Sequence, residues 1–250
     1  RKPQGKIPSL RGLKKDEAHA LIDRVIKTAN TRDVWLNQSE IQELLKYYGI
    51  KYAEIRTAAT AAEAQKAAAA IGFPVAVKLE SPTITHKTDV GGVILNVTSK
   101  EGVADAFNTI KTNLKKIGKE KEMTGVSVQQ MLSGGIETIV GVTQDPQFGP
   151  LMMFGSGGIY AELIKDVVMK IHPITDLDAV EMINSLKMSK LFEGYRGAPP
   201  RDTKAVEDLL LRVSAMINDV PEIAEMDLNP VNVMPKGEGY RVIDARIKLK

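Results

Sequence analysis

The chain has 250 residues, enough for one large core or two modest domains. Its hydrophobic fraction of 43% and charged fraction of 26% are ordinary for a globular protein. A net charge of +3, interleaved acids and bases, and an aromatic fraction of 5% argue against a nucleic-acid-binding surface. The absence of cysteine excludes disulfides, thiolate metal sites and cysteine nucleophiles, and fits a reducing cytoplasm. No apolar run reaches the length of about 18 residues that a membrane helix needs.

The first half of the chain alternates helical patterns with short β-branched segments. Ser39 with Gln42, and Thr60 with Glu63, have the spacing of a capping box, and Ser99 is expected to cap a further helix. Glycines are expected to end these helices. The predicted helices are 16–31, 39–49, 60–72 and 99–118, and the predicted strands are 52–57, 75–79 and 92–97.

The second half consists of strands separated by Gly- and Pro-rich turns, followed by two helices and a hairpin. The mixture of strands and helices along the whole chain predicts two α+β lobes with a cleft between them. The predicted strands are 125–131, 136–143 and 151–154, the helices 178–191 and 203–219, and the hairpin strands 224–234 and 240–247.

A loop with a lone histidine follows the predicted strand at 75–79. Lys78 lies near the end of this strand, and His86 precedes the pair Gly91-Gly92, whose N–H groups carry no side chain. A cation, an imidazole and a double glycine together suggest phosphate handling, and a neutral imidazole is a competent phosphoryl acceptor. The alternatives are a lysine that extends into solvent and a loop histidine without a role.

Two further segments carry polar groups that could bind a metal ion or a phosphate. Asn229 and Asp244 are expected to face each other on the predicted hairpin, where their oxygens suit a Mg²⁺ ion shared with phosphates. The alternative is a polar hairpin rim with a turn at Asn229. The run Gly155–Gly158 allows a phosphate-binding nest or a flexible turn.

Together these segments resemble the ATP-grasp β subunit of ADP-forming acyl-CoA synthetases, of the ADP-forming acetyl-CoA synthetase type. The resemblance runs from about Ser39 to the C-terminal residue and implies an ATP-grasp fold of two α+β subdomains with the nucleotide in the cleft between them. It implies an N-terminal extension with a helix at 1–35, a C-terminal subdomain of 36–50 plus 129–250, and an N-terminal subdomain of 51–128 that carries the His86 loop. The segments that carry it are Phe73–Val93, Ile136–Gly141, Asp145–Gly158, Asp166, Asp227–Pro230 and Asp244–Arg246.

The resemblance also implies roles for ten residues. His86 matches a phosphohistidine and Asp227 the acid that steadies it. Arg246 stands where relatives often carry lysine, and neither it nor Arg196 receives a role. The implied nucleotide-binding residues are Lys78, Gly91, Gly92, Gln130, Met131 and Glu137, and the implied metal ligands are Asn229 and Asp244.

The implied reaction converts acyl-CoA, ADP and phosphate to acid, CoA and ATP, with acetyl-CoA as the expected acyl-CoA. A phosphoryl group would pass through phospho-His86 to ADP in the presence of Mg²⁺. Because the chain has no CoA-binding Rossmann fingerprint, a CoA-binding α subunit is an expected partner, in a cytoplasmic heterotetramer of two α and two β subunits. No nucleic acid or membrane partner is expected.

Two other functions stay open from the sequence. An ATP-grasp carboxylate–amine ligase would not need His86. A non-catalytic nucleotide-sensing module of the kind appended to protein acetyltransferases tends to lack this histidine. Acyl specificity, physiological direction and subunit stoichiometry are not determined by these residues.

Overall fold

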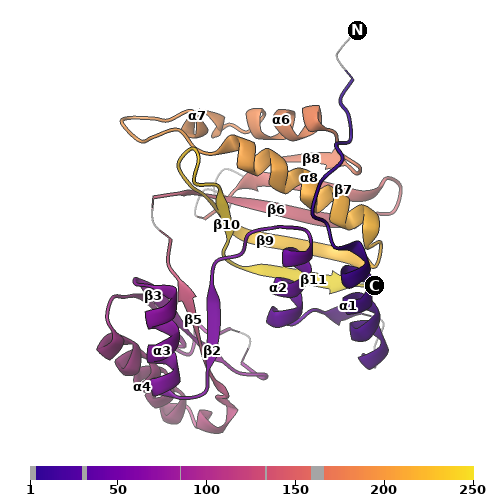
Figure 1. Ribbon diagram of the computed structural model, residues 1–250. Coiled ribbons are helices and arrows are strands. Elements are labelled where there is room, and N and C mark those ends of the chain that lie inside the picture. Colours follow the sequence, from indigo (N-terminus) through magenta and orange to yellow (C-terminus); the bar gives the residue numbers. More distant parts are fainter. Residues whose placement is uncertain (1–3, 30–32, 85, 133, 159–165) are drawn as a thin grey trace. The chain divides into compact units, whose positions relative to one another are not determined.

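The structure of the protein is a computed structural model, which describes residues 4–29, 33–84, 86–132, 134–158 and 166–250 (Figure 1). The chain divides into two compact units, each built from helices and an antiparallel sheet. The first unit comprises Arg1–Tyr52 and Gly134–Lys250, and the second comprises Ala53–Ser133. The mixed α+β class predicted from the sequence is therefore confirmed.

The first unit contains a seven-stranded sheet with the order β1-β11-β9-β6-β7-β8, in which β10 also pairs with β9. Five helices accompany these strands in the described part of the unit. The helices are α1 (Lys15–Thr28), α2 (Gln38–Tyr47), α6 (Asp176–Asn184), α7 (Ser189–Phe192) and α8 (Thr203–Asp219). The strands are β1 (Val34–Trp35), β6 (Ile136–Asp145), β7 (Gly149–Ser156), β8 (Val167–Ile171), β9 (Ile223–Val233), β10 (Tyr240–Val242) and β11 (Ala245–Leu249).

The two faces of this sheet have different environments. Val140 is paired with Phe154 across β6 and β7, and both side chains are buried in one core with residues of α2 and α8. Successive residues of a strand point to opposite faces. Gly141, the next residue of β6, is paired with Asp227 on β9, whose side chain is exposed. The sheet therefore has a helix-covered face and a face that carries polar side chains.

The second unit is a four-stranded sheet with the order β2-β5-β3-β4, covered by two long helices. Alanine side chains of the first helix allow it to lie close to the second, and both contribute to a separate core. The elements are β2 (Ile55–Ala58), α3 (Ala61–Ile71), β3 (Val75–Glu80), β4 (Val93–Val97), α4 (Lys100–Lys116), the 3-10 helix η1 (Glu120–Glu122) and β5 (Gly125–Gln130).

The predicted cap of the second helix is wrong by two residues. Asn37, not Ser39, caps α2: its side chain accepts the N–H of Glu40 at 3.0 Å, and the Glu40 carboxylate accepts the N–H of Asn37 at 2.8 Å. The pairs Asn37–Glu40 and Ser39–Gln42 both have the spacing of a capping box, and Asn is at least as good a cap as Ser. The predicted caps Thr60 and Ser99 are confirmed, since each side chain accepts a backbone N–H three residues later.

The segment predicted as an N-terminal extension with a helix contains α1, which contributes to the core of the first unit. Three further boundaries differ from the predicted ones. The predicted boundary between residues 128 and 129 falls inside β5, whose two neighbours are both strands of the second unit. The predicted helix 178–191 is two helices, α6 and α7, and the returning hairpin strand is split into β10 and β11. Strand β8 was not predicted at all.

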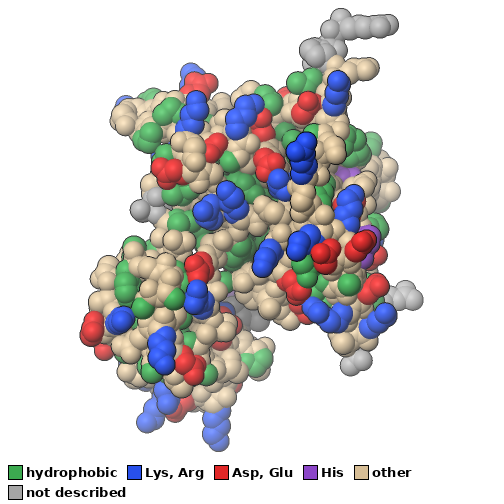
Figure 2. Space-filling view, viewed as in Figure 1, with side chains coloured by type: hydrophobic (Ala, Val, Ile, Leu, Met, Phe, Trp, Pro, Cys, Tyr) green, Lys and Arg blue, Asp and Glu red, His purple; other side chains and the backbone are tan. Residues whose placement is uncertain are grey.

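On the face of the molecule seen in Figure 2, basic and acidic side chains are interspersed. In the described parts of the chain, no helix has both the length and the apolar character to cross a membrane.

Candidate functional site

Lys78 is held on the sheet of the second unit by a glutamine. Its ammonium group donates a hydrogen bond of 2.5 Å to the side-chain oxygen of Gln129, a buried residue of the neighbouring strand β5. The lysine is itself half-buried, so it does not simply extend into solvent. Gln129 received no role from the sequence, although a polar residue within an apolar strand was a signal that could have identified it.

His86 lies in the loop between β3 and β4 and is exposed. The loop is anchored before the histidine by Ile84, which is buried and whose N–H is accepted by Ser81 Oγ at 3.1 Å. After the histidine, Lys87 forms an ion pair of 3.2 Å with Glu80. The imidazole is thus presented to solvent by a loop that is fixed on both sides.

The glycine pair closes this loop rather than offering free donors. The N–H of Gly91 is accepted by the carbonyl of Thr88 at 3.0 Å, and that of Gly92 by the carbonyl of Lys87 at 2.8 Å. Gly91 has a φ of +65°, and a Cβ on Gly92 would lie 2.8 Å from the Lys87 carbonyl oxygen. The expectation that both N–H groups are available to phosphate is therefore wrong for this structure.

Two of the residues expected to bind the nucleotide, Gln130 and Met131, also use their N–H groups within the second unit. Gln130 donates its N–H to the carbonyl of Glu54 at 2.9 Å, and Met131 donates its N–H to the carbonyl of Pro74 at 3.1 Å. Any contact that these residues make with a base in this conformation would use other atoms.

Glu137 is exposed on β6 of the first unit, where its Cα is paired with that of Asn232. Its carbonyl accepts the N–H of Gly157 at 2.8 Å, and a Cβ on Gly158 would lie 2.6 Å from its carboxylate. The glycine run thus approaches Glu137 closely. Because Ser156 is the last residue of β7, only the end of this run leaves the strand.

Four polar residues converge at β9 and β11. The N–H of Asn229 donates to the carbonyl of Asp244 at 3.0 Å, so the two predicted metal ligands face each other across the strands. Asp227 is paired in register with Arg246. All four side chains belong to exposed residues. The register thereby gives Arg246 a neighbour that sequence spacing alone did not reveal.

The Asp227 carboxyl has a raised pKa. Burial by neighbouring side chains is the main cause, and the charge of Asp244 adds to it. A hydrogen bond from Asn229 and the charge of Arg246 oppose the rise. The carboxyl is therefore reachable from solvent but partly desolvated.

The donor set at this hairpin fits a hard cation. The Asn229 amide oxygen and the Asp244 carboxylate are oxygen donors of the kind that Mg²⁺ shares with phosphates. Among the described residues, no three His, Cys, Asp or Glu side chains converge as a metal cage. An ion here would need further oxygens from its ligand.

The comparisons with known proteins agree with this architecture. A model of the ATP-grasp domain matches residues 27–249. The β subunit of ADP-forming acetate–CoA ligase II from Pyrococcus furiosus is 45% identical, over 94% of this chain and 99% of its own length. The ADP-forming 4-hydroxybutyrate–CoA ligase from Nitrosopumilus maritimus is 44% identical over 98% of this chain, which spans only 34% of that protein.

Solved structures show the same similarity. Acetyl-coenzyme A synthetase 1 from Ca. Korarchaeum cryptofilum, in complex with coenzyme A, Ca-AMPCP and HgCl+, matches with 39% identity and a TM-score of 0.82, over 93% of this chain and 100% of the matched one. A complex of that enzyme with coenzyme A and Mg-AMPPCP, described with its phosphohistidine segment pointing towards the nucleotide binding site, matches with 38% identity and a TM-score of 0.78, over the same shares. The chain therefore belongs to the ATP-grasp family and, within it, to the group formed by the β subunits of ADP-forming acyl-CoA synthetases and the matching regions of longer ADP-forming CoA ligases.

Proposed function

We propose that this chain transfers a phosphoryl group through phospho-His86 to ADP, coupled to the conversion of acetyl-CoA to acetate and CoA. The observation that carries the proposal is the exposed imidazole of His86, in a loop anchored on the strand that presents Lys78. An exposed neutral imidazole can act as nucleophile without prior unfolding of the loop.

The proposed steps balance as follows. Acyl-CoA and phosphate give an acyl phosphate and CoA on a partner subunit. The phosphoryl group leaves the acyl oxygen, which departs as a carboxylate, and is carried by a histidine of that partner to a ring nitrogen of His86. The P–N bond then breaks as a β-phosphate oxygen of ADP takes the phosphorus, which yields ATP and restores the imidazole.

The other site residues have proposed supporting roles. Lys78 would offset phosphate charge, held in position by Gln129. Asp227 is the proposed acid that steadies a phosphohistidine. Asn229 and Asp244 would hold Mg²⁺, which supplies charge neutralisation at the phosphates when it is bound. Gly91, Gly92, Gln130, Met131 and Glu137 are the further proposed nucleotide-side positions.

The proposed partner is a CoA-binding α subunit, in a cytoplasmic heterotetramer of two α and two β subunits. The Pyrococcus relative is named as a β subunit, which implies a second kind of subunit. In the Nitrosopumilus relative, the matching region is about a third of one longer chain. Acetate is the proposed product because two of the relatives above are named for acetate or acetyl-CoA.

The test is transfer of label from ATP carrying a labelled γ-phosphate, in the presence of Mg²⁺, with and without an α subunit. We expect acid-labile, base-stable label on the native chain and its loss in His86→Ala. The matched control is His19→Gln, because His19 lies on α1, where its ring contacts the Asp219 carbonyl, and the variant should keep the label. Label that survives in His86→Ala would refute the proposal, and nucleotide binding without label on the native chain would favour a sensing module.

A further inference from the structure

Tyr52 lies on the backbone beside the strand end that leads to Asp244. It pairs in parallel with Val242, the last residue of β10, and the N–H of Val242 is accepted by the carbonyl of Lys51 at 2.8 Å. Asp244 follows two residues later in the chain. The tyrosine is half-buried and packs against the core of the first unit. The backbone and the core therefore both fix Tyr52 near this proposed metal ligand.

Gln38 binds the hydroxyl of Tyr52. Its side-chain amide donates a hydrogen bond of 2.8 Å to Tyr52 Oη. Gln38 is the first residue of α2, and the capping box of Asn37 and Glu40 fixes the start of this helix. A phenolic hydroxyl is a donor as well as an acceptor. Because the Gln38 amide uses a lone pair of the oxygen, the hydroxyl proton can be given to another acceptor.

Asp244 is a charged acceptor that acts on this hydroxyl. Burial raises the pKa of the Tyr52 hydroxyl, the Gln38 hydrogen bond lowers it, and the charge of Asp244 raises it further. One oxygen of the Asp244 carboxylate accepts the N–H of Ala245 at 2.9 Å. A carboxylate has two oxygens with about four acceptor positions. It can therefore accept the hydroxyl proton and still bind a cation.

We propose that Tyr52 is a positioning residue for the metal site, a role that rests on the proposed function, because Mg²⁺ at Asn229 and Asp244 is part of that function. The Tyr52 hydroxyl, oriented by Gln38, directs its proton to the Asp244 carboxylate and restricts the positions that this ligand can take. Groups that orient metal ligands in this way commonly change metal affinity about 10- to 100-fold. Mg²⁺ depends strongly on such orientation, because it requires near-octahedral ligands, whereas Ca²⁺ accepts a more varied geometry.

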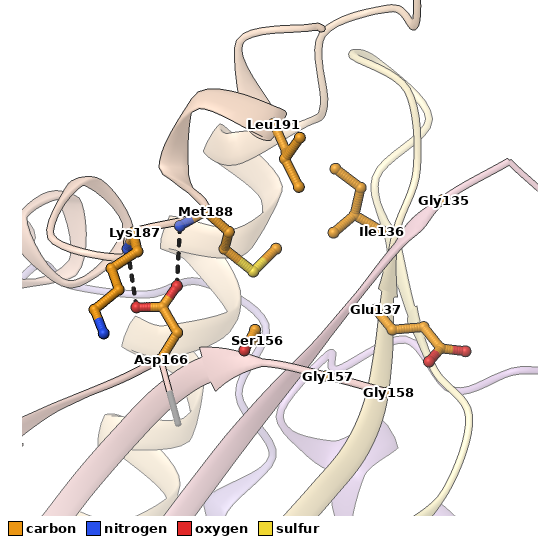
Figure 3. A pocket seen from close by; sticks show the side chains of 10 residues that line it. All are labelled: Gly135, Ile136, Glu137, Ser156, Gly157, Gly158, Asp166, Lys187, Met188 and Leu191. Atoms are coloured by element: carbon orange, nitrogen blue, oxygen red, sulfur yellow. Dashed lines mark hydrogen bonds between the residues drawn. The ribbon is translucent and has the colours of Figure 1, made fainter. Parts of the chain in front are cut away.

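Nucleotide binding can report on this site. Glu137 and Gly157–Gly158, which are proposed nucleotide-side groups, line a pocket of about 460 Å³ in the first unit, and Figure 3 shows the glycines passing beside Glu137. Asn229 and Asp244 belong to the same unit. A Mg²⁺ ion shared between these ligands and phosphate oxygens should strengthen nucleotide binding. The size of this gain measures how well the metal is held.

The test is calorimetric titration of the full chain with the analogue AMPPCP in excess Mg²⁺, in excess Ca²⁺ and in EDTA. We expect Mg²⁺ to raise the affinity of the native chain. Tyr52→Phe should reduce this gain about tenfold, reduce the Ca²⁺-dependent gain by less, and leave the affinity in EDTA unchanged. Gln38→Met should show the same pattern, and it decides the question if Tyr52→Phe proves unfolded. The matched control is Tyr47→Phe, which loses a hydroxyl bonded to Glu43 and should keep the native gain.

Asp244→Ala separates the role of Tyr52 from the proposed metal site. It should lose most of the Mg²⁺-dependent gain. Such a loss, together with a native gain in Tyr52→Phe, would overturn the positioning role alone. A native gain in Asp244→Ala, or no gain in the unmodified chain, would overturn the metal assignment and the role of Tyr52 with it. An equal fall of the Tyr52→Phe affinity in Mg²⁺, Ca²⁺ and EDTA would show a purely structural role and would also overturn the proposal.

Discussion

Asp227 has both a raised pKa and a proposed role in phosphoryl transfer. Its raised pKa means that the folded chain binds the carboxyl proton more tightly than the unfolded chain does. The bound proton stabilises the folded chain fully when the pH is below the pKa that Asp227 has in the unfolded chain. This stabilisation is lost as the pH rises through the higher pKa that Asp227 has in the folded chain. At neutral pH the native chain therefore carries a partly desolvated charge that opposes folding.

Asp227→Asn is expected to raise the unfolding temperature of the first unit at pH 7 by about 1–2 °C, a small value because solvent screens this exposed side chain. The gain should vanish below the ordinary aspartate pKa, where both side chains are neutral. Calorimetry between pH 3 and pH 8 measures this. Asp23→Asn, on the exposed side of α1, is the control and should show no comparable gain. A gain that is independent of pH, or a loss at pH 7, would contradict the assignment.

At the scale of elements, stability measurements can decide which of two residues, Asn37 or Ser39, caps the start of α2. Asn37→Ala removes the acceptor for the Glu40 N–H and should destabilise the first unit by about 1 kcal/mol. Ser39→Ala is the matched control and should change stability by less than about 0.5 kcal/mol, because Ser39 lies inside the helix. Chemical denaturation measures the free energy of unfolding of both variants. A larger loss of this free energy in Ser39→Ala than in Asn37→Ala would support Ser39 as the cap.

Elements with local signals were predictable, and those set by distant contacts were not. Helix α8 occupies the predicted range 203–219, because an amphipathic pattern defines it locally. The break between α6 and α7 has no Gly or Pro. It is set by Asp166, which accepts N–H groups of Lys187 and Met188 across 21 and 22 residues of sequence. Likewise, β8 lies at the sheet edge, and its only strand partner is β7 in the described residues.

The site follows the same rule. Individual residues such as His86 and Lys78 could be proposed from the sequence because their types are unusual in their segments. Their partners were not, since Gln129 is 51 residues from Lys78 and the pairing of Arg246 with Asp227 depends on strand register. The conformation of Gly91 and Gly92 also depends on tertiary contacts, because their N–H groups close the loop instead of remaining free.

At the scale of the whole molecule, the described residues form two hydrophobic cores that share no residue. One includes Leu209 on α8, and the other includes Ile110 on α4. Each core is covered by helices of its own unit, so each unit has the means to unfold cooperatively on its own. Neither Leu209 nor Ile110 has any measurable exposure.

Calorimetry of the intact chain is therefore expected to resolve two unfolding transitions. Leu209→Ala should destabilise the first unit, and Ile110→Ala the second, each by about 2–5 kcal/mol, because each removes buried methyl groups and leaves a cavity. Each substitution should lower one transition and leave the other in place, so the two variants serve as controls for each other. The isolated segment 53–133 should retain its helical circular dichroism and the Ile110-sensitive transition. A single transition that both substitutions shift equally would show that the two cores unfold together.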